Sequence, residues 1–397
     1  MKKNKIILLG ILSLLSACLS QNITKPNSEI SSIEETSQSQ VTPTLEPTIR
    51  PTAYPLPEDT NYNRKVVYFS DFDNNYKLIT INPDGTDEKT LTFTDEELYT
   101  IFISLDGKKV YYLTTGVYFN GQRTGINKLY SLNIDGTDKK ILFQGVIANS
   151  SISRDRKKII FQDNNLTNGN INIYDLEKEN LTKLDVIGGN PSLSPDNSKI
   201  TFSKDFGKNY EDSFLRNLYV SNADGTNIKL IGNKNKIDYE YPKWLPNGLE
   251  IIFQYGDIEK QKSGLYTISY DGSNLKKFPV DSSVAISPDG EKMAYINYLN
   301  NNNKSELIIA NIDNSNPIKI MTGSYIGAFI WSSDSKKALF KTDQIFIINA
   351  DGTDLKTLSP KDIYFNFPDS MPGTKTYTGT GCIDWWLDFI LNINRYK

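Results

Sequence analysis

The sequence contains no histidine and only two cysteines among its 397 residues. The absence of histidine excludes Ser-His-Asp and Cys-His catalysis, imidazole acid/base chemistry and every metal site with histidine ligands. Two cysteines are too few for a Cys₄ zinc site or a disulfide framework. We therefore expect no metal and no cofactor, and carboxylate chemistry is the only catalytic chemistry left open.

The chain also lacks an excess of positive charge and a long hydrophobic run. Its 44 Lys and Arg residues are balanced by 47 Asp and Glu residues, for a net charge of −3. This balance gives no electrostatic reason to expect a nucleic-acid partner. The only sustained apolar run near the N-terminus is 6–17, which is too short to cross a bilayer core of about 30 Å as a helix.

The first eighteen residues have the pattern of an export signal. Three lysines precede the apolar run, and the run ends in Leu15-Ser16-Ala17-Cys18. This ending resembles the lipobox of bacterial lipoproteins. The resemblance implies a signal peptide over 1–17, a diacylated Cys18, and a lipid anchor on the outer face of a bacterial membrane, or on the outer membrane of a diderm. The alternative is an ordinary secreted protein.

Residues 18–60 are predicted to be the lipidated cysteine followed by a disordered linker. They are rich in Ser, Thr, Pro, Gln and Glu and contain almost no aromatic residue. Such a segment cannot bury enough apolar surface to offset the entropy lost on ordering. The remaining domain, 61–397, is expected to be held away from the membrane by this tether.

Residues 61–397 consist of two alternating short motifs. The first is a β-rich run ending in Asp-Gly-Thr or a close variant, as at 84–86, 135–137, 224–226, 271–273 and 351–353. The second is Ser-Pro-Asp-Gly or a variant, as at 104–107, 153–156, 194–197, 245–248, 287–290 and 332–335. Both are tight turns, because Gly accepts positive φ and Asp bonds amides of its own turn. The motifs recur roughly every 38 to 51 residues, the period of four-stranded propeller blades.

The paired motifs resemble the PD40 (WD40-like) repeats of TolB-like β-propellers. The resemblance implies an all-β propeller of four-stranded blades. Seven second strands, starting near Val66, Val110, Ile159, Ile200, Ile251, Met293 and Ala338, predict seven blades, and six blades is the alternative. Only six first strands precede them, so we expect the C-terminal segment, at 362–367 or nearby, to close the ring against the first blade.

The turns are uniform in length, whereas the connections between second and third strands run from short (343–344) to long (115–127 and 205–217). Irregular loops are where binding usually occurs. We therefore predict an interaction rim of exposed aromatics, comprising Tyr118, Phe119, Phe206, Tyr210, Phe214, Tyr239, Tyr241 and Tyr298. Trp244 is expected in the core. Cys382 is expected to be an inert thiol, next to an apolar run at 383–391 that caps the propeller.

These features favour a membrane-anchored, extracytoplasmic, non-catalytic scaffold that binds envelope proteins. A carbohydrate- or cell-wall-binding module, with a polysaccharide partner, is the alternative. A carboxylate-based glycosidase is a third hypothesis, since paired carboxylates need no histidine. The chain lacks the Gly-x-Ser-x-Gly elbow of the hydrolases that carry propellers, and TolB-like oligogalacturonate lyases hold their metal with histidines. We therefore expect that the chain is not an enzyme.

Overall fold

The computed structural model describes strands and turns between residues 65 and 358, and one further strand near the C-terminus. The described residues are 65–72, 75–96, 98–114, 118–119, 122–123, 126–163, 169–205, 215–232, 237–257, 262–281, 284–299, 304–323, 326, 329–342, 344–358 and 392–394. The predicted signal peptide, Cys18, the linker, the segment 362–367 and Cys382 lie outside this part of the chain. Among the described residues, no helix is long and apolar enough to cross a membrane.

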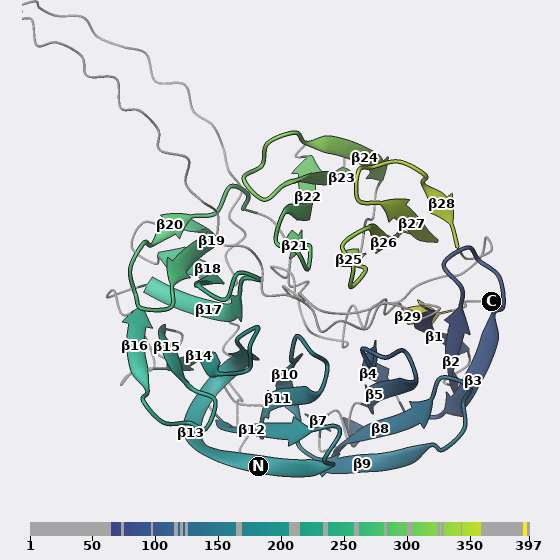
Figure 1. Cartoon of the computed structure of the whole chain (residues 1–397), viewed down its shortest axis with the longest axis horizontal. Coiled ribbons are helices and arrows are strands. Elements are labelled where there is room, and N and C mark those ends of the chain that lie inside the picture. The colour runs from purple at the N-terminus through teal and green to yellow at the C-terminus, as the bar shows by residue number, and fades with distance from the viewer. Residues whose placement is uncertain are drawn as a thin grey trace, which may run out of the picture. The chain divides into compact units, whose positions relative to one another are not determined.

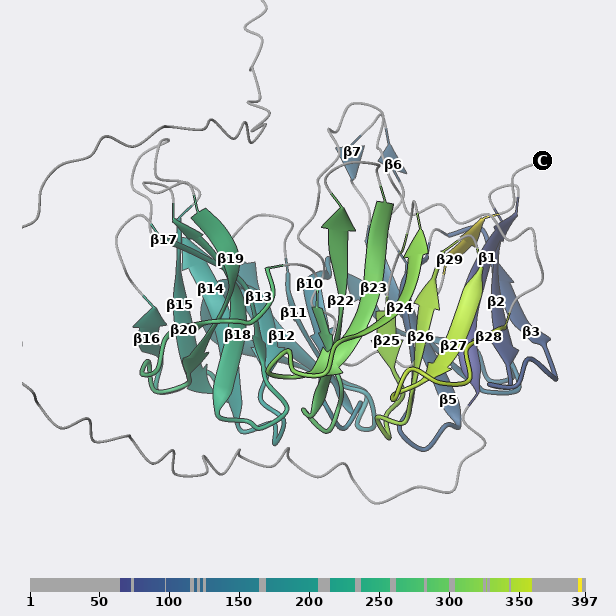
Figure 2. The same ribbon diagram turned by 90° about the horizontal axis from the view of Figure 1, so that it is seen from above.

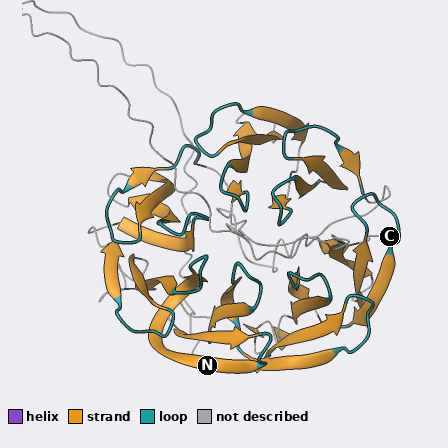
Figure 3. Ribbon diagram, viewed as in Figure 1, coloured by secondary structure: helices purple, strands orange, loops and turns teal. Residues whose placement is uncertain are grey.

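The strands form sheets arranged around a common axis (Figure 1, Figure 3), and their pairing is antiparallel except between β1 and β29. Two four-stranded sheets come first along the chain. One contains β1 (Val66–Phe72), β2 (Asn75–Ile81) and β3 (Lys89–Thr94), with β29 (Asn392–Asn394) beside β1. The other contains β4 (Leu98–Ile103), β5 (Lys109–Thr114), β8 (Asn127–Asn133) and β9 (Lys140–Gly145). A small hairpin of β6 (Tyr118–Phe119) and β7 (Gln122–Arg123) stands between β5 and β8.

A continuous seven-stranded sheet follows. Its members are β10 (Ala148–Ile152), β11 (Lys158–Gln162), β12 (Gly169–Asp175), β13 (Asn180–Leu193), β14 (Lys199–Asp205), β15 (Arg216–Asn222) and β16 (Lys229–Gly232). The long strand β13 joins its two halves. Its first part pairs with β12, and its last part, after a shift in register, pairs with β14.

Three four-stranded sheets complete the ring. The first contains β17 (Ile237–Trp244), β18 (Glu250–Asp257), β19 (Lys262–Ser269) and β20 (Lys276–Lys277). The second contains β21 (Val284–Ile286), β22 (Lys292–Leu299), β23 (Lys304–Asn311) and β24 (Ile318–Gly323). The third contains β25 (Phe329–Trp331), β26 (Lys337–Lys341), β27 (Ile345–Asn349) and β28 (Lys356–Thr357).

The prediction of an all-β propeller is confirmed, but the prediction of seven separate blades is wrong. The described structure has five separate four-stranded blades, and the rest of the ring is the seven-stranded sheet. The reason lies in β13, where Gly188 and Gly189 do not form a turn. Instead, the strand continues through a bulge between Gly189 and Ser192, so no connection divides the sheet.

Hydrophobic clusters join each sheet to the next. One cluster includes Val66 and Ile79 from the first blade together with Leu339 and Ile347 from the last, all at most 6% exposed. The first and last blades therefore pack face to face, which closes the ring and leaves it no open end. The C-terminal strand β29 also pairs with β1, as the predicted closure requires, although the pairing is parallel and comes from Asn392–Asn394.

The outermost strand of each sheet carries a lysine in its paired segment. These lysines are Lys89, Lys140, Lys229, Lys276, Lys319 and Lys356, and Lys183 occupies the same place in the first part of β13. A charged side chain on an exposed edge opposes pairing with a strand of another molecule. The ring therefore exposes its outer edges without inviting edge-to-edge aggregation.

Candidate functional site

The two repeated turns lie on one side of the ring, called here the turn face. The Asp-Gly-Thr turn is closed by its aspartate: Oδ1 of Asp84 accepts hydrogen bonds from the backbone N–H of Thr86 (2.9 Å) and from its hydroxyl (2.6 Å). The same two bonds recur at Asp135, Asp224, Asp271, Asp313 and Asp351. These bonds lower the pKa of Asp84 below its usual value. The predicted role of these aspartates as turn formers is confirmed.

The Ser-Pro-Asp-Gly turns are closed in a comparable way. In the turn after β10, the hydroxyl of Ser153 donates to Asp155 at 2.6 Å and accepts the backbone N–H of Lys158 at 2.9 Å. Neighbouring turns are also bonded to one another. The amide of Asn197 donates to Asp155 at 2.8 Å, and the hydroxyl of Ser335 accepts the backbone N–H of Asp289 at 2.9 Å. The polar groups of this face are therefore largely used by the fold.

Arg154 links turns across the axis of the ring. It occupies the position that Pro195, Pro246 and Pro288 hold in other copies of the turn. Its guanidinium donates to the carbonyl oxygen of Pro246 at 2.9 Å and to that of Pro288 at 3.2 Å, and the residue is only 5% exposed. Burial lowers the pKa of Arg154 to about 10, with Asp289 opposing the shift. Arg154 thus ties three sheets together at the centre of the turn face.

The opposite side, called here the loop face, holds the strand ends that flank the long connections, such as Thr114 of β5 and Asp205 of β14. Figure 2 shows the β6–β7 hairpin standing out from this face. Irregular connections are where binding usually occurs, so the loop face is the candidate binding surface.

An ion network lies at the loop face between β14, β15 and β17. The guanidinium of Arg216 contacts Asp205 at 3.2 Å, Asp238 at 3.4 Å and, more closely still, Glu240. The backbone N–H of Arg216 also donates to Asp238 at 2.9 Å. Burial raises the pKa of Asp238 to about 6, although Arg216 acts in the opposite direction. One carboxyl group of this network therefore changes its charge in a mildly acidic range.

The predicted rim aromatics differ in how exposed they are in the structure. Tyr241 is 41% exposed and Tyr298, near the end of β22, is 64% exposed, as the prediction requires. Tyr118 and Phe119 form β6, but their side chains are not described. Phe206, Tyr210 and Phe214 lie outside the described residues.

Tyr239 must be removed from the predicted rim. It is 1% exposed and packs beside Phe253, with ring centroids 5.2 Å apart. The bulge between Glu240 and Lys243 explains why Tyr239 is buried while Tyr241 is not, because it changes which side chains of β17 face the core. Trp244, 3% exposed, is in the core as predicted.

Tyr241 has an unusual backbone conformation that sequence reasoning missed. The innermost strands β10, β13 and β17 each contain a bulge, and each places one residue in the left-handed region. That residue is Asn149 (φ 46°), Asn190 (φ 51°) or Tyr241 (φ 50°). Asparagine tolerates this region far better than an aromatic residue does. The repeat itself held the signal, since Tyr241 aligns with two asparagines.

Comparisons with known proteins agree with the fold. No family model matches the chain. A tricorn-like protease C-terminal subunit from Sulfurisphaera tokodaii is 28% identical over 292 residues, covering 65% of this chain and 31% of the relative. The Tol-Pal system protein TolB from Francisella tularensis is 27% identical over 284 residues, covering 56% of this chain and 63% of TolB. This chain therefore spans under a third of the tricorn-like relative and under two thirds of TolB.

Solved structures give the same picture. Oligogalacturonate lyase in complex with manganese aligns with a TM-score of 0.55 at 13% identity, covering 77% of this chain and 87% of the lyase. The β-propeller domain of the Trilobed protease from Pyrococcus furiosus aligns with a TM-score of 0.53 at 15% identity, covering 75% of this chain and 99% of that domain. The described residues form a TolB-like β-propeller.

The expectation that the chain is not an enzyme is wrong, because enzymes are among the proteins similar to it. The similar proteins include a tricorn-like protease at 28% identity and a lyase of the same fold. Lack of histidine excludes imidazole chemistry only, and a propeller can take part in an enzyme by holding or admitting substrate. Among the described residues, no three His, Cys, Asp or Glu side chains gather as a metal-binding set.

Proposed function

We propose that the propeller is a protein-binding scaffold of the bacterial cell envelope and that its partner binds the loop face around Tyr241. The observation that carries this proposal is the exposed aromatic side chain held in a left-handed backbone conformation. Such a conformation costs of order 1–3 kcal/mol and clusters at functional positions. Asparagine at the two equivalent bulges shows that the fold itself does not require tyrosine there.

The two faces differ in what they offer a partner. On the turn face, serine, aspartate and Arg154 are engaged with one another and with backbone groups. On the loop face, Tyr241 and Tyr298 expose large amphipathic rings, which are typical of protein interfaces. The TolB relative is named for the Tol-Pal system, which supports envelope proteins as the class of partner.

The location of the scaffold is part of the proposal. The lipobox-like sequence at 15–18 would attach the chain through Cys18, and the linker to residue 60 would hold the propeller off the membrane. Radioactive palmitate should label the wild-type protein in growing bacteria and should not label Cys18→Ala. Equal labelling of both proteins would refute the anchor.

We also infer that the seven-stranded sheet acts as two blades, which would give the propeller seven units. The two parts of β13 pair with different neighbours, so one strand serves as the outer strand of one unit and the inner strand of the next. Seven hydrophobic clusters join successive units around the ring.

Photo-cross-linking in intact cells tests the binding face. A benzoylphenylalanine residue replaces Tyr241, Tyr298 or, as the control, Phe93, which is 59% exposed on the outer strand β3. We expect the same cross-linked protein from positions 241 and 298 and none from position 93. Adducts only at position 93, or retention of the chain on purified cell-wall polysaccharide without any protein adduct, would refute the proposal and favour the carbohydrate-binding alternative.

A second candidate is that the propeller binds substrate for a proteolytic reaction. The 28% identity to a tricorn-like protease subunit favours this candidate, although the match covers 31% of that protein. Purified chain is incubated with fluorescein-labelled casein, with heat-denatured chain as the control. A rise in the fluorescence anisotropy of the casein above the control would support substrate binding, and an equal signal would remove this candidate.

A further inference from the structure

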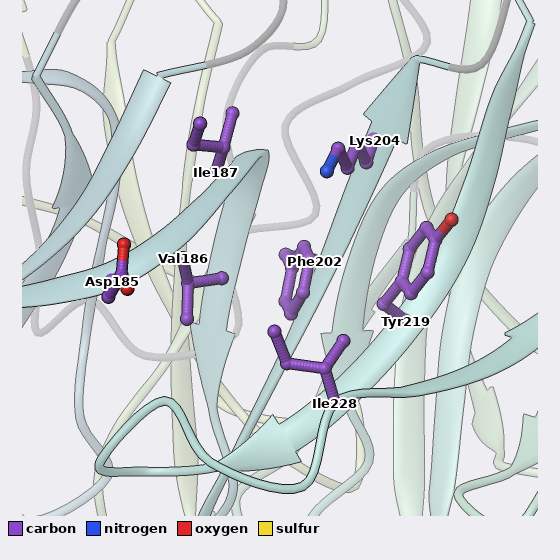
Figure 4. Close-up of a pocket in the computed structure, with 7 residues that line it drawn as sticks. All are labelled: Asp185, Val186, Ile187, Phe202, Lys204, Tyr219 and Ile228. Carbon is purple, nitrogen blue, oxygen red and sulfur yellow. The ribbon is translucent and has the colours of Figure 1, made fainter.

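A shallow pocket of about 180 Å³ opens where β13 crosses from one half of the seven-stranded sheet to the other (Figure 4). Its floor and walls are Val186, Ile187, Phe202, Tyr219 and Ile228, with Lys204 and Asp185 at its ends. Ile187 and Ile228 are each 51% exposed, and Leu230, paired with Tyr219 on the adjacent strand, is 40% exposed. The site thus exposes contiguous apolar surface at the one place where the ring departs from separate blades.

A matched position elsewhere in the ring shows which residue differs beside the pocket. Phe202 pairs with Tyr219 across β14 and β15, and their rings stack with centroids 5.5 Å apart. The equivalent pair in the second blade is Tyr112 and Tyr130, stacked at 4.7 Å.

In that second blade, the stack is covered from its turn. Lys139, four residues after the aspartate of the Asp-Gly-Thr turn, lies with Nζ 5.8 Å and 5.2 Å from the two ring centroids. The same place in the turn that begins at Asp224 is Ile228, which is too short to reach across the rings as lysine does. Of the stacked pair, Tyr219 is partly exposed at the pocket, whereas Phe202 is only 1% exposed.

The size and the charges of the pocket identify its occupant. Sites for drug-sized ligands are about 300–1,000 Å³, so this pocket suits a single side chain rather than a whole small molecule. The ammonium group of Lys204 makes no hydrogen bond or ion pair with a described residue, and it stands at one end of the apolar walls in Figure 4. Asp185, exposed at another edge, would repel an acidic group placed there.

We propose that this pocket docks a peptide segment of a partner protein, with one apolar side chain against Ile187, Tyr219 and Ile228 and a neighbouring acidic residue paired with Lys204. The site lies between β13, β14 and β15 and does not include Tyr241. It would give the scaffold a second point of attachment on its outer wall.

The test uses random heptapeptides displayed on phage and selected on the full-length chain. We expect the enriched peptides to contain an apolar residue close to Asp or Glu. The selected peptide should bind Ile228→Lys at least about tenfold more weakly, because the new lysine would lie over Tyr219, as Lys139 lies over Tyr130, and exclude one buried apolar side chain. Lys204→Glu should also weaken binding, because it removes the only partner proposed for the acidic residue.

Leu355→Lys is the matched control. Leu355 also follows an Asp-Gly-Thr turn by the same spacing and is 43% exposed, but it does not line the pocket. It should leave peptide affinity unchanged. The proposal is overturned if no peptide is enriched, if enriched peptides lack acidic residues, or if Ile228→Lys and Leu355→Lys have equal effects. It is also overturned if decanoate, rather than peptide, shifts the NMR signals of Val186 and Ile187, since the occupant would then be an acyl chain.

Discussion

Replacing Gly136 by alanine should destabilise the propeller much more than the same change at Gly85. Both glycines occupy the same place in an Asp-Gly-Thr turn, with φ of +88° and +85°, and each donates its N–H to an asparagine carbonyl at 2.8 or 2.9 Å. An alanine at either position therefore suffers the same backbone strain, about 1–2 kcal/mol.

The surroundings of the two turns differ. A Cβ at Gly136 would lie 2.6 Å from the carbonyl oxygen of Leu91 and 3.2 Å from its Cα, which belong to the backbone of the preceding blade. At Gly85 the nearest atom is the carbonyl oxygen of Leu358, at 3.9 Å, an ordinary contact. Overpacking against backbone typically costs about 1–3 kcal/mol. We expect Gly85→Ala to cost about 1–2 kcal/mol and Gly136→Ala about 2–5 kcal/mol.

Urea unfolding followed by tryptophan fluorescence measures the difference, with both variants and the wild type at the same pH. Gly272→Ala provides an intermediate case, because its Cβ would lie 3.4 Å from the carbonyl oxygen of Ile231. The expected order of cost is Gly85, Gly272 and then Gly136. Equal losses in the free energy of unfolding for Gly85→Ala and Gly136→Ala would refute the prediction. They would show that a Cβ at Gly136 does not approach the backbone of Leu91 as closely as 2.6 Å.

Three further predictions concern the buried charges. Because the folded-state pKa of Asp238 is raised to about 6, the stability that this group contributes is present below its unfolded pKa of about 4 and is lost as pH rises to 6. The free energy of unfolding of Asp238→Asn, relative to wild type, should therefore increase between pH 4 and pH 6. Urea unfolding at several pH values measures this difference, and a pH-independent difference would contradict the prediction. Removing the cation with Arg216→Met should move the pKa of Asp238 still higher, as followed by carbon NMR of its carboxyl group; a lower pKa would show that Arg216 does not stabilise the carboxylate. Arg154→Met should lower the free energy of unfolding by about 1–3 kcal/mol, because it leaves the carbonyl groups of Pro246 and Pro288 without their donor; an unchanged melting temperature would contradict this.

The repeated elements were predictable because their causes are local. All seven predicted second strands are strands in the structure, each starting within a residue or so of the predicted position. The turns followed from residue chemistry as well: Gly85 takes positive φ, and Asp84 bonds the amide two residues on. Nothing beyond a few neighbouring residues is needed to specify such features.

The features that define the candidate site depend on distant parts of the chain. Arg154 contacts the carbonyl groups of residues 92 and 134 positions away, and no local pattern predicts those contacts. Tyr239 and Tyr241 are two residues apart, so a regular strand would place both on one side. The bulge at Tyr241 breaks that period, so one ring is buried and the other is exposed. Alternation along β17 therefore fails where the candidate site begins.

The close passage of β13 over Phe202 also determines where the pocket forms. A Cβ at Gly188 would lie 2.4 Å from the ring of Phe202, so β13 can pass directly over that ring only because residue 188 lacks a side chain. This close passage keeps β13 continuous between the two halves of the sheet and places Val186 and Ile187 beside the stacked rings of Phe202 and Tyr219. Gly188 thus allows the sheet to stay undivided and also positions the two residues, Val186 and Ile187, that form one wall of the pocket. A change at Gly188 should alter strand pairing and peptide docking together, whereas Ile228→Lys should alter docking alone.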